Sequence, residues 1–299
     1  MSMRKNSKYI CHYCGSKNTE FYKTINNFSL FICKNCLLLQ THLQRLSLKK
    51  VNENKYSSKY LDNYENILSK RLNVNFRRRI EQIDQFVKGG RILDIGCSTG
   101  LFLQNLHRCS QNSWEIYGID INHKSIDRAK QLINGHFYSK ALQDIKFPEN
   151  YFDCVTCYDV LEHDIDLPNT LKSIYKIVKK SGVILVQVPN HKSLLAMLTG
   201  EKWDWWCIPD HVFHFDVNTA EKILILNKFK IIYKSTWTYP YIFIENIRGS
   251  IKNNISNQLI KSILSKFLYV PIIIIWLISL ITDKIFDTGG LITIFAQKV

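Results

Sequence analysis

The sequence predicts an α/β fold built on a mostly parallel sheet. Between residues 89 and 236, short apolar runs alternate with helix-patterned segments, an order typical of parallel sheets. The expected strands are residues 91–95, 115–120, 152–158, 183–188 and 229–236, and a last run covers 291–297. Two of these runs end in a carboxylate beside a glycine, which indicates a ligand site at the carboxyl edge of the sheet.

The first of these turns is R-I-L-D-I-G-C-S-T-G, residues 91–100. The apolar run leads into Asp94, and Gly96 and Gly100 allow the backbone to approach a ligand closely. The second run, W-E-I-Y-G-I, is followed by Asp120, and an acid at such a position can accept both hydroxyls of a ribose. The G-x-x-x-G spacing fits neither the dinucleotide fingerprint nor the phosphate-binding P-loop. A nucleoside-bearing ligand of another kind is therefore expected.

Residues 93–100, L-D-I-G-C-S-T-G, resemble motif I of the class I S-adenosylmethionine-dependent methyltransferases. Residues 118–120 match the acidic position after the second strand of that family, and residues 151–155 with D-V-L-E-H at 159–163 resemble the fourth strand and the segment after it. Residues 178–190 resemble the helix, turn and fifth strand. The resemblance implies a doubly wound Rossmann-like sheet whose last strand is antiparallel to the rest.

The resemblance also implies which residues contact S-adenosylmethionine. Those assigned to the methionine part are Asp94, Gly96, Cys97 and Gly100. For the nucleoside, Asp120 is assigned to the ribose, Ile121 flanks the adenine, either Gln143 or Asp144 contacts the adenine edge, and Tyr158 lines the pocket.

Two C-x2-C pairs near the N-terminus predict a zinc ribbon. The four cysteines are Cys11, Cys14, Cys33 and Cys36. Their spacing suits a four-thiolate zinc site, and a segment this small has too little core to fold without a metal. Four thiolates leave no open coordination position, so this zinc would be structural. Unrelated cysteines or a disulfide are the weaker interpretations. Cys154 and Cys157 share the spacing but lie on an expected buried strand, where we interpret them as core.

The 299 residues are expected to form three segments. Residues 1–40 would be the zinc ribbon, residues 41–88 a helical linker or substrate cap, and residues 89–299 the methyltransferase domain with an apolar insertion at 261–285. The linker carries a helical pattern of apolar residues at Ile67, Leu68, Leu72, Phe76, Ile80, Ile83 and Phe86. The polar first ten residues and the odd count of nine cysteines predict a cytoplasmic protein.

The net charge of +15 is concentrated near the N-terminus, where the first 90 residues hold 17 Lys/Arg against 6 Asp/Glu. This basic third indicates either an anionic partner, such as nucleic acid, membrane headgroups or a nucleotide-linked substrate, or simply a solvated surface.

Candidate catalytic residues lie in two places. Glu162 and His163 follow the expected fourth strand, and His211 and His214 lie in W-D-W-W-C-I-P-D-H-V-F-H-F, residues 203–215. An oxygen nucleophile gains from a general base near neutral pH, so His211 or His214 is the preferred base, with structural hydrogen bonding as the alternative. The D-x-x-E-H segment also resembles a carboxylate–histidine magnesium site of some methyltransferases. Catalytic magnesium is the less favoured interpretation.

Residues 267–282 form an uncharged apolar stretch. Sixteen residues fall short of the roughly 20 that cross a bilayer. Two interpretations stay open: an interfacial helix against the inner face of the membrane, and a buried helix packed on the sheet or at a dimer contact.

The predicted function is methyl transfer from S-adenosylmethionine to a small-molecule or lipid-linked glycan acceptor, as an O-methylation in cell-surface polysaccharide biosynthesis. The sugar acceptor is implied by resemblance to a zinc-ribbon subgroup tied to such modification. The alternative is an RNA-modifying methyltransferase that uses the ribbon and basic third as a clamp, which a strong salt dependence of RNA binding would favour. A non-catalytic binding module is disfavoured by the intact glycine loop.

Overall fold

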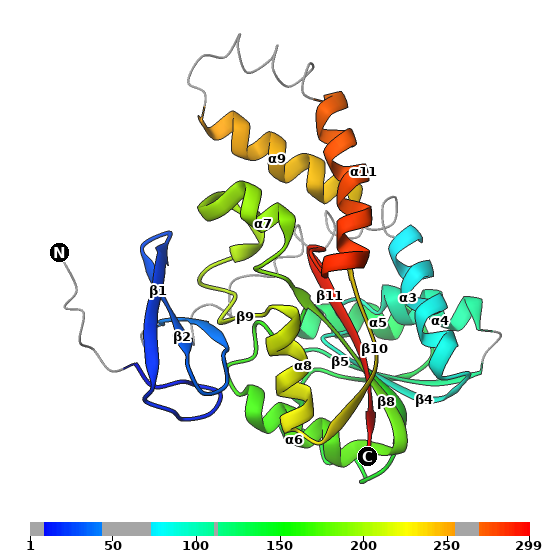
Figure 1. The fold of residues 1–299 in the computed structure, drawn as a ribbon. Helices are drawn as coiled ribbons and strands as arrows, with labels where there is room; N and C mark the ends of the chain where they lie inside the picture. Colours follow the sequence, from blue (N-terminus) through cyan, green and yellow to red (C-terminus); the bar gives the residue numbers. More distant parts are fainter. Residues whose placement is uncertain (1–8, 44–72, 111–112, 255–268) are drawn as a thin grey trace. The chain divides into compact units, whose positions relative to one another are not determined.

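The computed structural model describes residues 9–43, 73–110, 113–254 and 269–299 (Figure 1). The chain divides into two compact units. Unit 1 comprises Met1–Leu43, Gln187–Ile223 and Tyr233–Ile294, and unit 2 comprises Gln44–Val186, Leu224–Ile232 and Phe295–Val299. The predicted helical residues Ile67, Leu68 and Leu72, and the first two residues of the apolar stretch, lie outside the described ranges.

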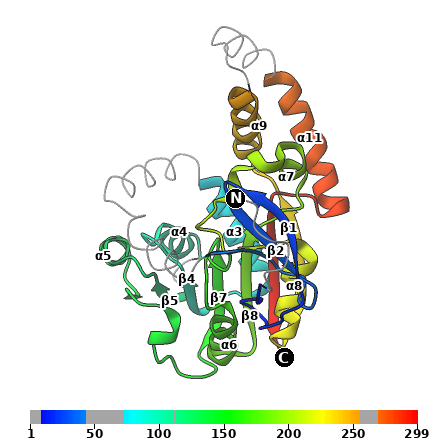
Figure 2. The ribbon, with the colours of Figure 1, turned by 90° about the vertical axis from the view of Figure 1, so that its left-hand side faces the viewer.

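The larger sheet has seven strands in the order β10-β11-β8-β7-β4-β5-β6. The strands are β4 (Gly90–Ile95), β5 (Trp114–Ile119), β6 (His136–Tyr138), β7 (Phe152–Tyr158), β8 (Val178–Pro189), β10 (Phe229–Trp237) and β11 (Leu291–Lys298). β4 pairs in parallel with β5 and with β7 (Figure 2). β5 pairs in parallel with β6. The predicted α/β fold with a mostly parallel sheet is confirmed.

Two strand predictions were wrong in detail. The segment 178–182, expected as a helix end and a turn, is the beginning of β8. The sequence of this segment contains two lysines and a glycine and gives no strand signal, and in β8 Lys180 and Ser181 are exposed, with Ser181 at a φ of 61°. β6 was not predicted, because three residues are too few to carry a periodic signal.

The helices of unit 2 bury their apolar faces at helical spacing. They are α3 (Asn73–Phe86), α4 (Leu101–Cys109), α5 (His123–Leu132) and α6 (Leu167–Ile177), and α8 (Val217–Leu226) ends in this unit. In α3, Phe76, Ile80 and Ile83 are buried one turn apart, which confirms the described part of the predicted pattern. Cys154 and Cys157 are buried in β7, as predicted for core residues.

Unit 1 contains a four-stranded sheet in the order β1-β2-β3-β9. Its strands are β1 (Thr19–Ile25), β2 (Phe28–Cys33), β3 (Leu39–Thr41) and β9 (Phe213–His214), paired antiparallel. In the β3–β9 pair, Leu39 lies opposite His214 and Gln40 opposite Phe213. The cysteine-bearing segment and the histidine-rich segment therefore share one sheet.

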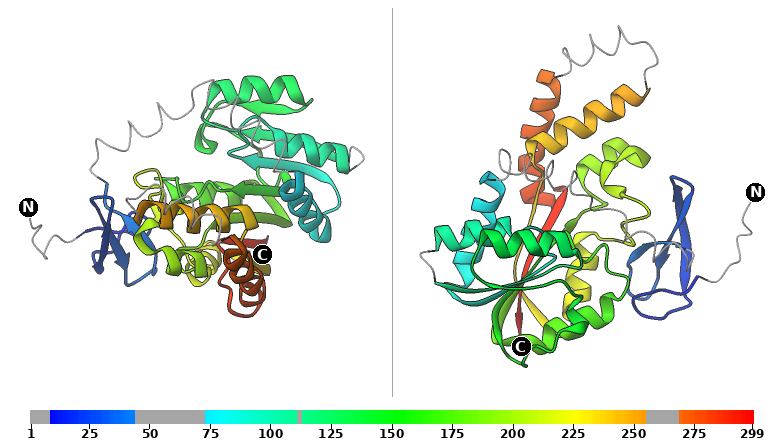
Figure 3. Two further views of the ribbon diagram at one scale, coloured as in Figure 1. Left: turned by 90° about the horizontal axis from the view of Figure 1, so that it is seen from above. Right: turned by 180° about the vertical axis from the view of Figure 1, so that it is seen from behind.

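The helices of unit 1 are α7 (Leu194–Thr199), α9 (Pro240–Asn254) and α11 (Tyr269–Phe286), with 3-10 turns at Gly200–Lys202 and Asp204–Trp206. A third 3-10 turn, Leu142–Asp144, lies in unit 2. α9 packs against both α7 and α11, and Figure 3 shows these helices from two further sides. Leu30, Leu39, Trp203, Trp206 and Phe243 are among the residues of the hydrophobic core of this unit. Among the described residues, no helix is both long and apolar enough to cross a membrane.

Candidate functional site

The loop after β4 has a backbone that side chains disfavour. Gly96, Ser98 and Gly100 have φ values of 73°, 48° and 76°, in the left-handed region. A Cβ atom on Gly96 would lie 2.5 Å from Cγ2 of Val160, so even alanine would force a shift. The glycine at this position is therefore required by both the conformation and the close approach of the segment after β7.

The same loop is hydrogen-bonded to the end of β5. The N–H groups of Gly96 and Cys97 donate to the carbonyl oxygen of Ile119 at 2.8 and 3.0 Å. Asp120 accepts from the N–H of Ser98 at 3.0 Å through Oδ2 and from the N–H of Asn122 at 2.8 Å through Oδ1. Each carboxylate oxygen has a further lone pair. The side chain predicted to bind ribose is thus fixed in place with acceptor capacity left.

Asp94 is a buried carboxyl in β4. Its Oδ1 accepts a hydrogen bond of 2.6 Å from the hydroxyl of Thr156 in β7. Burial raises the pKa of Asp94 to about 7, against the opposing effects of the Thr156 hydrogen bond and the positive charge of Arg79. A positively charged ligand group nearby would favour the ionised form.

The sequence did not single out Arg79, which lies on α3. Its guanidinium carbon lies 3.9 Å from the centre of the Tyr158 ring, and its Nη2 lies 3.4 Å from Oδ2 of Asp159. Tyr158 also meets Phe102 of α4 edge-on, with ring centroids 5.0 Å apart. Arg79 therefore holds two residues at the carboxyl end of β7. No local motif marks it.

The remaining predicted cofactor residues lie in three settings. Cys97 is buried and Ile121 is exposed on the loop after β5. Gln143 and Asp144 are exposed on the 3-10 turn, and the amide of Gln143 donates to the hydroxyl of Thr170 at 2.5 Å. Their contacts with a cofactor stay predictions.

Glu162 and His163 lie together on the turn after β7 in unit 2. Glu162 is buried, and the backbone N–H of His163 donates to the carbonyl oxygen of Val160 at 3.0 Å. Their catalytic roles stay predictions.

His211 and His214 lie close together in unit 1, with ring centroids 6.4 Å apart. Nδ1 of His211 is 2.9 Å from the carbonyl oxygen of Trp205, and Nε2 of His214 is 2.8 Å from the hydroxyl of Thr41. Thr41 also donates its single hydroxyl proton to the carbonyl oxygen of His211 at 3.0 Å. Hence His211 carries its proton on Nδ1, and neutral His214 carries it on Nε2.

The two histidines differ in their surroundings. His214 is buried against the edge of Trp206, and burial moves its pKa well below the usual range, with further lowering by the neighbouring His211. Trp203 and Trp206 pack into the core of unit 1, while Trp205 is only partly buried. The tryptophan-rich segment is therefore core in large part, and Trp205 is its more accessible ring.

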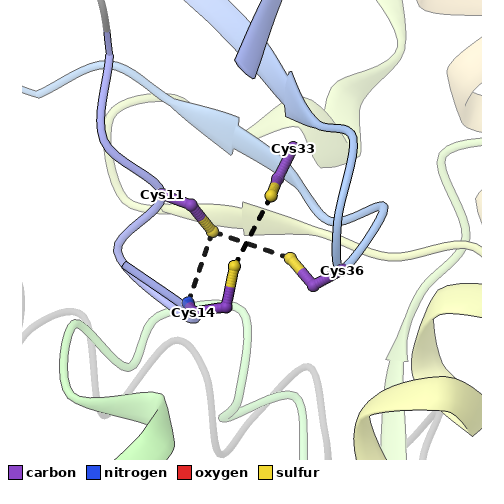
Figure 4. Close-up of side chains that lie close together, drawn as sticks. All are labelled: Cys11, Cys14, Cys33 and Cys36. Atoms are coloured by element: carbon purple, nitrogen blue, oxygen red, sulfur yellow. Dashed lines mark hydrogen bonds between the residues drawn. The ribbon is translucent and has the colours of Figure 1, made fainter. Parts of the chain in front are cut away.

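The four N-terminal cysteines converge in unit 1 (Figure 4). Their sulfur atoms all lie within 4.8 Å of one another, with 3.6 Å between Sγ of Cys11 and Cys36 and 3.5 Å between Sγ of Cys14 and Cys33. Gly15 and Leu37 have φ values near 70°, and the N–H groups of these two residues donate to the carbonyl oxygens of Cys11 and Cys33. Each C-x2-C thus forms a tight turn that directs two sulfurs inward.

Hydrogen-bond donors also face these sulfurs. Nε2 of Gln40 donates to Sγ of Cys11 at 2.9 Å, and the N–H of Cys14 donates to the same sulfur at 3.4 Å. The pKa of the Cys11 thiol is lowered to about 4, first by Cys36 and further by these donors, while burial opposes the shift. Burial raises the pKa of the Cys14 thiol, and the hydrogen bond to Cys11 and burial raise the pKa of the Cys36 thiol. The convergence of the four sulfurs, one of which favours thiolate, is compatible with zinc.

A parallel α/β sheet with a glycine loop and an acid after the next strand defines a nucleoside-binding fold. A family model described as "Methyltransferase domain" matches residues 64–233, more than half of the chain. The chain belongs to this family, the Rossmann-like S-adenosylmethionine-dependent methyltransferases.

Curated relatives are similar over part of their length. The chain is 29% identical over 105 residues to a ubiquinone/menaquinone biosynthesis C-methyltransferase of Vibrio cholerae, covering 33% of this chain and 40% of the relative. It is 26% identical over 140 residues to a ubiquinone biosynthesis O-methyltransferase of Coxiella burnetii, covering 44% and 58%. The chain thus spans about half the length of these relatives.

Solved structures share the fold. A methyltransferase from Archaeoglobus fulgidus matches 80% of this chain and 100% of its own, with a TM-score of 0.54 at 20% identity. A phosphoethanolamine N-methyltransferase of Haemonchus contortus, solved with S-adenosyl-L-methionine, matches 87% of this chain and 62% of its own, with a TM-score of 0.56 at 18% identity.

Proposed function

We propose that the protein transfers the methyl group of S-adenosylmethionine to a hydroxyl oxygen of a small, lipid-linked acceptor. The observation that carries the proposal is the glycine loop, held against the end of β5 by Ile119 and Asp120. The family membership supports the same cofactor.

The residues at the loop fit this cofactor chemically. Asp120 offers spare lone pairs on a fixed carboxylate, which suits the two hydroxyls of a ribose. The Asp94 carboxyl, with its raised pKa, would ionise beside the cationic methionine part. When bound, S-adenosylmethionine supplies an electrophilic methyl group on a sulfonium. The protein would add proximity and orientation.

His211 is the proposed general base. The Nδ1–H donates to the carbonyl oxygen of Trp205, which fixes the ring and leaves the acceptor lone pair on Nε2. That nitrogen would take the acceptor hydroxyl proton as the new oxygen–methyl bond forms and the sulfur–methyl bond breaks. His214 is a weaker candidate, because Nε2–H is engaged by Thr41 in a buried site.

Two acceptor classes follow from different observations. A sugar carried on a lipid is the class indicated by the cysteine-bearing segment and its resemblance to sugar-modifying enzymes. A quinone precursor is the second class, because curated relatives are named for ubiquinone and menaquinone biosynthesis. Both acceptors are held in a bilayer by apolar chains. We therefore also propose that the protein works at the inner face of the membrane.

The four cysteines are proposed to bind one zinc ion. Cys11, Cys14, Cys33 and Cys36 would complete a tetrahedral site with no open position, so the metal would stabilise the ribbon and take no part in the reaction.

The proposal is tested by turnover with S-adenosylmethionine labelled in its methyl group. A polyprenyl-diphosphate-linked sugar and a hydroxylated polyprenyl quinone precursor are the two acceptors, and mass spectrometry reads the methylated product. His211→Ala and His211→Gln should lower kcat about a hundredfold or more, with the KM for the cofactor unchanged. His123→Ala, at an exposed side chain, is the matched control. Full turnover by His211→Ala would exclude His211 as the base, and labelling of neither acceptor would exclude both acceptor classes.

A further inference from the structure

Helix α11 buries two polar side chains beside apolar ones and leaves many of its aliphatic side chains exposed. The side of α11 turned into unit 1 carries Ile272, Trp276, Ser279 and Asp283, of which Ser279 and Asp283 are fully buried. The apolar residues on its other side are 42–69% exposed. They are Ile274, Ile275, Leu277, Ile278, Ile281, Ile285 and Phe286.

Hydrogen bonds fix this orientation. Oδ2 of Asp283 accepts from the hydroxyl of Thr238, and Oδ1 accepts from the hydroxyl of Thr288, both at 3.2 Å. Nε1 of Trp276 donates to the carbonyl oxygen of Thr238 at 3.2 Å. Rotating the helix to bury the isoleucines would break these bonds and expose the apolar indole instead. Specific hydrogen bonds therefore hold α11 in the orientation that exposes its apolar face.

We infer that this face of α11 inserts into the surface of an anionic bilayer. The 18 residues of α11 cover about 27 Å, and the exposed apolar residues recur from Ile274 to Phe286, so this part of the helix presents one continuous apolar stripe. Such a stripe suits a helix lying in the interface between lipid headgroups and chains.

The charge of the sequence before α11 indicates which lipid headgroups the helix would contact. Between Glu245 and Asp283 the chain has four basic residues and no acidic one. The basic residues are Arg248, Lys252, Lys261 and Lys266. Basic residues that precede an apolar interfacial segment in the sequence favour anionic headgroups over neutral ones, and the exposed Lys284 lies on α11 itself. The inference rests on the proposed membrane location, but it does not depend on which acceptor is methylated.

Flotation of the full chain with vesicles tests the inference, with no cofactor or acceptor present. Wild-type protein should float with vesicles of phosphatidylcholine and phosphatidylglycerol, and at least tenfold less with phosphatidylcholine alone. The double variant Ile278→Glu/Ile281→Glu should lose at least tenfold in partitioning to the anionic vesicles. Ile225→Glu on α8, at an equally exposed isoleucine, should bind as wild type does.

The results distinguish a bilayer from a second copy of the chain as the partner of this apolar face. Equal binding by wild type and the double variant would overturn the inference. A second result would also overturn it: wild-type protein does not bind vesicles but forms a dimer in sedimentation velocity, and the double variant does not form that dimer. The apolar face would then bind a second copy of the chain. The double variant should keep the wild-type turnover on a water-soluble acceptor. A failed acceptor assay with intact flotation contradicts only the proposed function.

Discussion

Asp94→Asn should make the cofactor-free protein more stable, and the gain should grow with pH. The carboxyl is buried, and burial raises its pKa from 3.8 to about 7 in the folded protein. A raised folded pKa means that the native state holds its proton more tightly than the unfolded chain does. Wild-type stability therefore falls by about 1.4 kcal/mol per pH unit between 3.8 and 7, for a total of about 4 kcal/mol. Asparagine does not titrate and can still accept from Thr156.

Urea unfolding between pH 5.5 and pH 8 measures this difference. The stability gap between Asp94→Asn and wild type should widen by about 2 kcal/mol over that interval. Asp127→Asn, at an exposed position on α5, corrects for the general effect of removing a carboxyl. Parallel curves for Asp94→Asn and wild type would refute the assignment of a neutral, buried Asp94 near pH 6. The cofactor should bind wild type more tightly as Asp94 ionises, and this pH dependence should vanish in the variant.

Three further outcomes are expected. Gly96→Ala should lower the free energy of unfolding by about 1–2 kcal/mol because of the left-handed backbone, and by more because of the contact with Val160. Unfolding by denaturant should show that the double variant Gly96→Ala/Val160→Ala regains part of this loss. Asp120→Ala should weaken both S-adenosylmethionine and adenosine by about tenfold to a hundredfold in calorimetry, and unchanged adenosine affinity would exclude the ribose role. The purified protein should contain about one zinc per chain by elemental analysis, and Cys33→Ser should abolish it and lower Tm; a metal-free wild type would contradict the site.

The strands and the cofactor loop could be predicted because their signals are local. An apolar run followed by D-I-G-C-S-T-G encodes both the strand β4 and the left-handed turn after it, within ten residues. The signal of the cysteine pairs is local too, because each C-x2-C turn is formed by four consecutive residues. Where a turn is formed by neighbours in the chain, sequence spacing was sufficient to predict the turn, and the binding roles of its residues stay predictions.

The long-range contacts that position those residues could not be predicted from sequence spacing. Arg79 meets Asp159 across 80 positions of the chain, and nothing in the helical pattern of α3 distinguishes it from Arg77 or Arg78. β9 has two residues, too few for any strand signal, yet its pairing with β3 brings His214 to Thr41. The burial of the tryptophan-rich segment could not be predicted, because composition does not distinguish a buried ring from an exposed one. Trp203 and Trp206 lie in the core of unit 1.

Thr41 gives the sharpest distinction between the two histidines that the sequence left equivalent. Its hydroxyl has one proton, and a carbonyl oxygen can only accept, so the bond to His211 consumes that proton and Nε2 of His214 must donate. The same logic at the carbonyl oxygen of Trp205 requires His211 to donate through Nδ1. His211 therefore has Nε2, the nitrogen at the far end of the ring from the backbone, as its unprotonated nitrogen, whereas neutral His214 has Nδ1. Because Thr41 ends β3, the strand that follows the cysteines, the pairing of β3 with β9 places the hydroxyl that sets the protonation of the His214 ring.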